Sequence, residues 1–318
     1  MTALITQQAS NLPALISASG EKVAVRFIEF FTANIHNPNT RRAYAKGIGH
    51  FMRWCEAQGI VSLATITPVH VAIYIKELSQ TKSAPTTKQR LAAIRMLFDW
   101  LVTGGTLPMN PAHAVRGPKH RVKRGKTPVL TGEEARQILD AIDVSQAIGQ
   151  RDRALIGLMT YTFARIGAAL AMNVDDVFVQ AGRMWIRLHE KGGKEHEMPC
   201  HHNLEDYLNV YIKGQGLSVD LKRPLFPTIG RGTSALTTHP MSQKDAYAMI
   251  GKRALRAKIE TKVCNHTFRA TGITAYFKNN GTLEKAANMA NHFSTRTTQL
   301  YDRRNDDITL DEIEKIQI

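Results

Sequence analysis

Residues 291–302 read N-H-F-S-T-R-T-T-Q-L-Y-D, and this segment is the most informative part of the chain for its fold. Within it, His292 precedes Tyr301 by nine residues. Further back along the chain, the segment N-H-T-F-R-A-T places His266 three residues before Arg269, which itself lies 23 residues before His292. A tyrosine oxygen becomes a nucleophile only when a base or nearby cations promote its deprotonation, and these segments supply both kinds of group.

Two segments upstream carry cations in contexts that suit a phosphate site. T-F-A-R-I-G-A-A-L surrounds Arg165, and the hairpin turn E-K-G-G-K-E-H-E-M-P surrounds Lys191. The chain has no glycine-rich phosphate loop, carboxylate-rich metal cluster or H-E-x-x-H motif, so metal-dependent nucleases and NTPases are disfavoured. Phosphate chemistry here would therefore depend on cations and a side-chain nucleophile.

The charge of the chain points to a polyanionic partner. The 318 residues favour two domains and carry a formal net charge of +15. Residues 1–127 hold 17 basic and 5 acidic residues, so most of the excess lies there. The N-terminus lacks a charged segment before an apolar core, and Arg165 interrupts the most apolar stretch, 154–172. With a membrane thus disfavoured, nucleic acid is the expected partner.

The cysteine content indicates a reducing compartment. Cys55, Cys200 and Cys264 are too few and too scattered for a disulfide framework, and they form no C-x-x-C pair for zinc. Histidines near Cys200 hint at a metal, but they lack a matching ligand cluster. We therefore expect a cytoplasmic protein without a structural metal.

Turn signals and composition divide the chain into four segments. Apolar residues recur at helical spacing through residues 20–114, which predicts an all-α domain. Residues 1–19 are expected to form an N-terminal extension, residues 115–127 a linker and residues 128–318 a second domain. The linker has no acidic residue and is rich in cations, so we expect it to contact DNA rather than serve as a solvated connector. The candidate DNA-binding residues are Arg116, Lys119, Arg121, Lys123, Arg124 and Lys126.

The second domain is expected to be a mainly helical α+β domain with a small antiparallel sheet. A capping box at Thr131 and Glu134 opens it, and a helical region follows over 151–173 with a break near Arg165. Alternating patterns then predict a sheet. Its strands are expected at 177–179, 184–190 and 195–200. Later helices are expected from Asn203, Ser242, Thr267, Thr282 and Thr309.

In the order and spacing of these motifs, the sequence resembles the tyrosine recombinase (phage integrase) family over residues 20–305. The resemblance implies an all-α, SAM-like core-binding domain followed by a catalytic domain. The roughly 20 residues before the first expected helix are too few for an additional arm-binding domain. A simple Xer-like or Cre-like recombinase is therefore favoured.

The resemblance also implies a role for each motif residue. Tyr301 would attack the scissile phosphorus to form a 3′-phosphotyrosyl intermediate, with His266 as the base. Arg165 and Arg269 would clamp the non-bridging oxygens. The remaining roles belong to Lys191, as the general acid with Lys194 as the alternative, and to His292, as a hydrogen-bond donor to the phosphate. Neither a metal nor ATP is implied.

Three positions depart from the family pattern. Phe163 replaces a turn glycine, Ala168 replaces an acidic residue three positions after Arg165, and Asn291 replaces the glycine before His292. Asparagine tolerates left-handed torsions nearly as well as glycine does. The geometry around Phe163 is therefore the open question.

The implied partner is a double-stranded recombination site, bound by a dimer and brought into a tetrameric synapse. A helix over 308–318 is expected to dock on a neighbouring protomer, with packing on its own domain as the alternative. Integration, excision or resolution of mobile or circular DNA would be the task. Two alternatives are a type IB topoisomerase-like enzyme, disfavoured by the helical N-terminal domain, and a non-catalytic DNA-binding regulator, disfavoured by the intact motif set.

Overall fold

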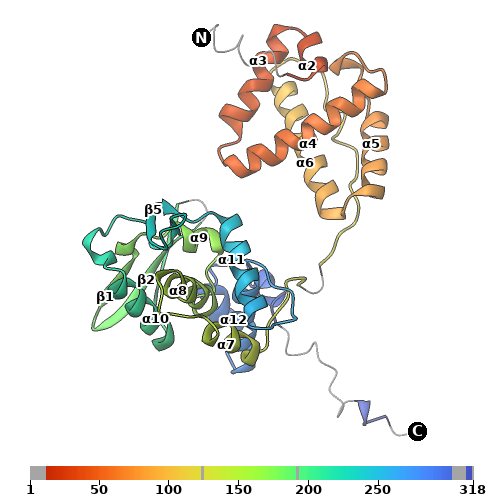
Figure 1. Ribbon diagram of the computed structural model, residues 1–318. Coiled ribbons are helices and arrows are strands. Elements are labelled where there is room, and N and C mark those ends of the chain that lie inside the picture. Colours follow the sequence, from red (N-terminus) through yellow and green to blue (C-terminus); the bar gives the residue numbers. More distant parts are fainter. Residues whose placement is uncertain (1–11, 123–124, 191–192, 303–312, 317–318) are drawn as a thin grey trace. The chain divides into compact units, whose positions relative to one another are not determined.

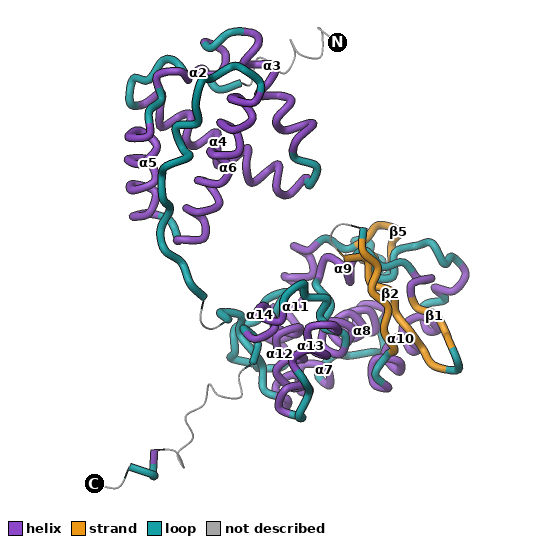
Figure 2. The backbone as a smooth tube through the Cα atoms, turned by 180° about the vertical axis from the view of Figure 1, so that it is seen from behind, coloured by secondary structure: helices purple, strands orange, loops and turns teal. Residues whose placement is uncertain are grey.

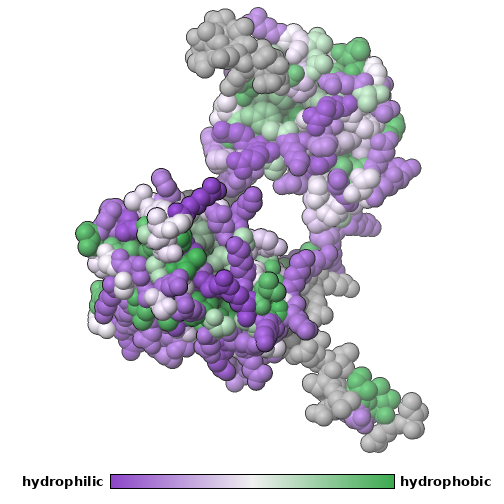
Figure 3. All heavy atoms as spheres, in the orientation of Figure 1, coloured by the Kyte–Doolittle hydropathy of each residue, from purple (hydrophilic) through white to green (hydrophobic). Residues whose placement is uncertain are grey.

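A computed structural model of the chain describes residues 12–122, 125–190, 193–302 and 313–316. The chain divides between Arg121 and Val122 into two compact units, each with a hydrophobic core of its own (Figure 1). Hydrophilic side chains cover most of the face of both units that Figure 3 shows. Among the described residues, no helix combines the length and apolar character needed to cross a membrane.

Among its described residues, the first unit contains helices and loops and no strand, as predicted (Figure 2). Apolar residues of the expected stripe, from Leu91 to Leu101, are buried in its core. Pro68 follows the cap residue Thr67 and opens a helix, because proline fits the first helical position. The α-helices are α2 (Ala14–Ala18), α3 (Glu21–Glu29), α4 (Pro38–Ala57), α5 (Pro68–Thr81) and α6 (Ala84–Thr103), with a π-helical turn at Phe30–Asn34.

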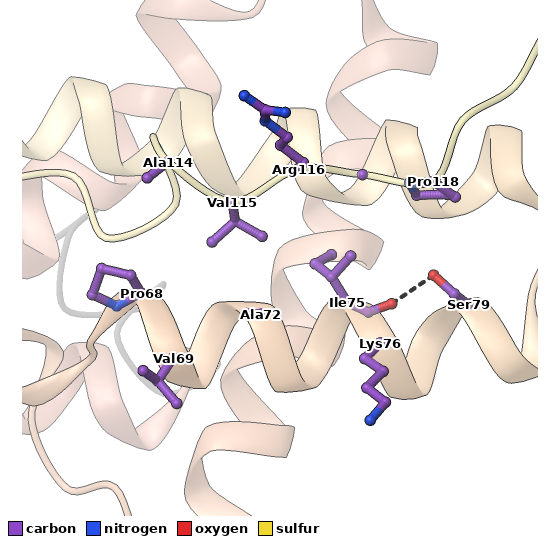
Figure 4. A pocket seen from close by; sticks show the side chains of 11 residues that line it. Pro68, Val69, Ala72, Ile75, Lys76, Ser79, Ala114, Val115, Arg116 and Pro118 are labelled. Atoms are coloured by element: carbon purple, nitrogen blue, oxygen red, sulfur yellow. Dashed lines mark hydrogen bonds between the residues drawn. The ribbon is translucent and has the colours of Figure 1, made fainter.

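The core of this unit extends past both of the boundaries expected from the sequence. Leu15 and Ile16 of α2 are buried in it, so the described end of the segment 1–19 is not a separate extension. Val115, at the start of the expected linker, is buried in the same core. Residues 114–118 run beside α5 and border an apolar groove of about 630 Å³ (Figure 4). With the division after Arg121, residues 115–121 of the expected linker therefore belong to the first unit.

The second unit combines helices with two small antiparallel sheets. The three-stranded sheet has the order β1 (Val177–Gln180), β2 (Arg183–Glu190), β3 (Lys194–Pro199), close to the predicted strands. A second sheet pairs β4 (Pro227–Ile229) with β5 (Leu236–Pro240). This sheet was not predicted, because strands of three to five residues give little periodicity. The helices are α7 (Gly132–Asp140), α8 (Ala147–Tyr161), α9 (Ile166–Leu170), α10 (His202–Gly214), α11 (Gln243–Arg256), α12 (Thr267–Lys278), α13 (Leu283–Met289) and α14 (Thr295–Gln299).

Local signals placed several of these helices correctly. The capping box of Thr131 and Glu134 is formed, and Ser242 and Thr282 accept hydrogen bonds at the starts of α11 and α13. The helical region breaks between α8 and α9, next to Arg165. Most of the helix predicted over 308–318 lies outside the described residues.

A buried ionic triad ties three elements of the second unit together. Asp152 of α8 accepts two hydrogen bonds from Arg151, at 3.0 and 2.7 Å, and two from Arg253 of α11, at 2.9 and 2.6 Å. Arg151 also donates to the carbonyl of Pro227 in β4 at 2.8 Å. All three side chains of the triad are at most 7% exposed, so the one carboxylate compensates two desolvated guanidinium groups.

We predict that Asp152→Asn lowers the free energy of unfolding by about 3–5 kcal/mol, because it leaves two buried guanidinium groups without a carboxylate. Urea unfolding followed by circular dichroism measures this loss. The matched control is Asp175→Asn, which breaks an ion pair with the exposed Lys222 and should cost less than about 1 kcal/mol. Equal losses in the two variants would contradict a structural role for the triad.

Candidate active site

Arg165 stands at the break between α8 and α9, where it is the N-cap of α9 in an extended conformation. Its Nη1 donates to Oε2 of Glu190 at 2.7 Å, and its Nη2 makes a long contact of 3.5 Å to the carbonyl of Asn291. The side chain is 37% exposed, so part of the guanidinium group remains open to a ligand.

Arg269, near the start of α12, is almost fully buried. Its Nη1 donates to the carbonyl of Phe163, and its Nη2 donates to the carbonyl of Ala290 at 2.6 Å. The same Nη2 lies 2.7 Å from Nε2 of His292. Desolvation, followed by the charge of Arg165, lowers the pKa of Arg269 to about 10. Arg269 is thus positively charged at neutral pH and anchors three segments of the chain.

The contacts of His292 assign its tautomer. Arg269 can only donate, so Nε2 must accept, and the proton of the neutral ring is on Nδ1. That nitrogen lies 2.8 Å from the hydroxyl of the buried Thr298. Desolvation, with Arg269 and Arg165 as further causes, lowers the pKa of His292 to about 3. The imidazole is therefore neutral at pH 7.

Tyr301 is held next to this pair by its ring and its backbone. Its ring stacks on that of His292, with centroids 5.9 Å apart and planes 12° from parallel. Its carbonyl accepts a hydrogen bond of 3.0 Å from Thr274 of α12. The phenol lies close enough to Arg269 to raise the pKa of that guanidinium, against the larger effect of desolvation. The residue spacing that singled out Tyr301 thus corresponds to contact in space.

His266 is the N-cap of α12, three residues before Arg269. Its pKa is lowered by desolvation and then by the charges of Arg269 and Arg165, which places it in the same cationic field. A lowered pKa leaves this imidazole neutral at pH 7, the form that can accept a proton. The structure therefore gathers five of the six expected residues: Arg165, His266, Arg269, His292 and Tyr301.

Lys191 lies outside the described residues. The flanking positions are described, and Glu190 pairs with Lys194 across the β2–β3 ladder. Lys194 is exposed at the start of β3.

The carboxylate of Glu190 is the feature of this site that sequence reasoning missed. It occupies the core-facing side of β2 with Met184, Ile186 and Leu188, and only 5% of its side chain is exposed. The sequence held one signal for this role: Glu190 is a charged residue at the next inward-facing position of an alternating apolar pattern. Ala168 stands where the family pattern has an acidic residue near Arg165. In the structure, Glu190 of β2 provides an acidic group next to Arg165 instead.

The two replaced glycines both keep a left-handed backbone. Asn291 has φ of 45°, as expected for asparagine. Phe163 has φ of 54°, which is strained for a bulky residue, yet its ring is buried in a small cluster with Ile273 and Phe277. Its carbonyl is the acceptor for Arg269. Burial of the ring offsets the strain and keeps the turn.

A cationic patch on the first unit was also missed. It is formed by Lys46, His50 and Arg53 of α4, with Lys82 and Arg90. The pKa of His50 is lowered first by desolvation and then by the cations around it: Arg90, Arg53, Lys46 and Lys82. A signal existed, because the three residues of α4 are four and three positions apart and share one helical face. Of the linker candidates, the described ones are exposed: Arg116, Lys119, Arg121 and Lys126.

Family models match both units. The model of the phage integrase family covers residues 128–307, and that of the phage integrase N-terminal SAM-like domain covers residues 26–105. The chain belongs to the phage integrase family. The family expected from the motifs is thereby confirmed, and so is the predicted fold of an all-α SAM-like domain followed by a helical domain with small antiparallel sheets.

Individual relatives agree with this family assignment. Tyrosine recombinase XerD of Corynebacterium glutamicum is 27% identical over 274 residues, which cover 83% of this chain and 86% of that protein. A crystal structure of lambda integrase residues 75–356, a dimer bound to a COC′ core site, has a TM-score of 0.68 at 17% identity and covers 90% of this chain and 96% of its own. The lambda integrase tetramer bound to a Holliday junction has a TM-score of 0.70 at 16% identity, with 96% and 83% covered.

The lowered pKa of His292 predicts a pH dependence of stability. Between pH 6.5 and about 3, the unfolded chain binds a proton at this ring that the folded state does not. Stability is therefore lost as pH falls below 6.5, with a slope of at most about 1.4 kcal/mol per pH unit from this group. Urea titrations from pH 7 to pH 5 should show a smaller loss for His292→Gln than for the wild type. Equal losses of stability in the two proteins would contradict the lowered pKa of His292.

Proposed function

We propose that this chain of the phage integrase family is a site-specific DNA recombinase that cuts and rejoins strands through a 3′-phosphotyrosyl intermediate. The observation that carries the proposal is the gathering of Arg165, His266, His292 and Tyr301 about the buried Arg269. The lambda integrase and XerD relatives are named as an integrase and a tyrosine recombinase, in agreement with it.

Tyr301 is the proposed nucleophile and His266 the proposed base. Attack of the phenolic oxygen on the scissile phosphorus forms the phosphotyrosyl bond, while the bond to the 5′ oxygen breaks. A neutral imidazole at His266 takes the phenolic proton as the attack begins. The second step reverses the first on another strand, because its 5′ hydroxyl displaces the tyrosine. Bond energy is thus conserved without ATP.

Arg165 and Arg269 are the proposed clamp for the non-bridging oxygens. Negative charge grows on these oxygens as the fifth bond forms, and fixed guanidinium groups stabilise it without reorganising. Burial and three hydrogen-bonding partners hold Arg269 in place, while the partly open Arg165 provides access for the phosphate.

Lys191 is the proposed general acid that protonates the leaving 5′ oxygen, and Lys194 is the alternative. His292 is the proposed hydrogen-bond donor to the phosphate. In the absence of DNA its Nε2 accepts from Arg269, so donation requires this contact to open and the nitrogen to gain a proton. A phosphate anion beside the ring favours that protonation.

DNA binding is assigned to the linker cations and to the patch of α4 and α6. The linker residues are Arg116, Lys119, Arg121, Lys123, Arg124 and Lys126. In both places the cations can neutralise phosphates and release counterions. Self-association as a dimer on one site and a tetramer in synapsis is proposed by analogy with the lambda integrase assemblies. The three cysteines, which are free, suit a cytoplasmic location.

We predict that Tyr301→Phe abolishes cleavage, because it removes the attacking oxygen and little else. The assay is covalent trapping on a nicked suicide duplex, read as a protein–DNA adduct on a denaturing gel. Affinity for the intact site should stay within a few-fold of wild type. An adduct formed by the Phe variant would identify another nucleophile. No adduct from the wild type would favour a non-catalytic DNA-binding protein.

We also predict that replacing Lys46 and Arg53 with Ala weakens binding to all duplexes alike. Each lost phosphate contact should reduce the slope of log affinity against log salt by about 0.9. Fluorescence anisotropy from 50 to about 200 mM salt measures both quantities. The control is Lys22→Ala, because its ammonium group instead donates to the carbonyl of Gly105. An unchanged slope in the double variant would remove the patch from the interface.

A further inference from the structure

A buried carboxylate touches the more accessible of the two guanidinium groups. Glu190 is the last residue of β2 and faces the core, with 5% of its side chain exposed. Its Oε2 lies 2.7 Å from Nη1 of Arg165. Among the ion pairs of the described residues, this one alone joins the sheet to the cations around Tyr301.

The pair constrains Arg165 more than it constrains Glu190. A carboxylate buried to this degree is costly without a cation, so the contact persists in the folded state. A guanidinium group is planar and rigid, and fixing one terminal nitrogen restricts the direction of the other two. Nη2 has only the 3.5 Å contact to the carbonyl of Asn291, and Nε makes no hydrogen bond to a described residue. These two nitrogens are left to meet a ligand.

The Arg165–Glu190 pair also sets the net charge of the site. After desolvation, the charge of Arg165 lowers the pKa of Arg269, and the charge of Glu190 acts in the opposite direction. With His266 and His292 neutral, the two guanidinium groups and one carboxylate sum to a single positive charge. A phosphodiester carries a single negative charge. The carboxylate thus allows two guanidinium groups to converge on one phosphate.

We propose that Glu190 is a positioning residue, whose carboxylate holds the Arg165 guanidinium group in the orientation that the scissile phosphate meets. This inference rests on the proposed function, in which Arg165 contacts that phosphate. Glu190 itself touches no reacting atom. It acts through Arg165, so its contribution should vanish when Arg165 is removed.

The test is a double-mutant cycle on the full chain, with Glu190→Gln, Arg165→Ala and the combination. Single-turnover cleavage of a suicide duplex and equilibrium binding to the intact site are measured separately. Glu190→Gln should slow cleavage by about 100-fold, the effect of a misplaced catalytic group, without weakening binding. Arg165→Ala should slow it by about 1,000-fold, and the double variant should be no slower.

The matched control is Glu197→Gln on β3. That carboxylate also pairs with an arginine, Arg187, at 2.8 Å, but Glu197 is exposed and Arg187 is only half-buried. Its cleavage rate should stay within about twofold of wild type, since surface ion pairs contribute little. Glu190→Asp keeps the charge and should cleave faster than Glu190→Gln, even if its unfolding temperature is lower. A purely structural role would instead make cleavage follow stability.

Each result of the double-mutant cycle either supports or overturns the positioning role of Glu190. The inference is overturned if Glu190→Gln cleaves at the wild-type rate, or if the double variant loses the product of both factors. If Glu190→Gln does not fold, Glu190→Ala, which also removes the carboxylate, takes its place in the same cycle with the same criterion. Failure of the proposed function is a different result: wild type forms no adduct, or Arg165→Ala cleaves normally while Glu190→Gln is slow.

Discussion

The burial of Arg269 is the constraint on which the candidate site depends. A guanidinium group taken out of water must have its donors satisfied, or the folded state loses several kcal/mol. Here the acceptors are the carbonyls of Phe163 and Ala290 and the imidazole of His292. One side chain thus joins the turn after α8, the end of α13 and the segment that leads to Tyr301.

This requirement explains the unusual backbone around the site. Phe163 and Asn291 both have left-handed torsions, and each lies in a segment that presents a carbonyl to one of the two arginines. Strain of this kind persists only where the surrounding structure holds it. The cluster of Phe163, Ile273 and Phe277 does so by burying the side chain of the strained residue against α12. Stability and the geometry of the cations therefore arise from the same contacts.

The two units differ in how their charged groups are exposed and compensated. The first carries its excess charge on exposed cations, which suits a long polyanion whose contacts are screened and exchangeable. In the second, the cations at the site are few, partly or fully buried, and compensated by one carboxylate, Glu190. Such a site loses little energy to solvent reorganisation when charge develops on a phosphate. Its histidines are neutral because desolvation, and after it the charge of the arginines beside them, lowers the pKa of each ring.

The amino-acid sequence was enough to predict the family, the helical first domain, the strands of the three-stranded sheet and the six candidate residues. These follow from local chemistry: apolar periodicity, caps such as Thr131, and the spacing of His266, Arg269, His292 and Tyr301. It did not reveal the Arg165–Glu190 pair, the tautomer of His292 or the burial of α2. These three features could be seen only in the folded chain, because each depends on groups from distant segments that meet where water is excluded. Local patterns report which face of an element is apolar, but not which partner that face will meet.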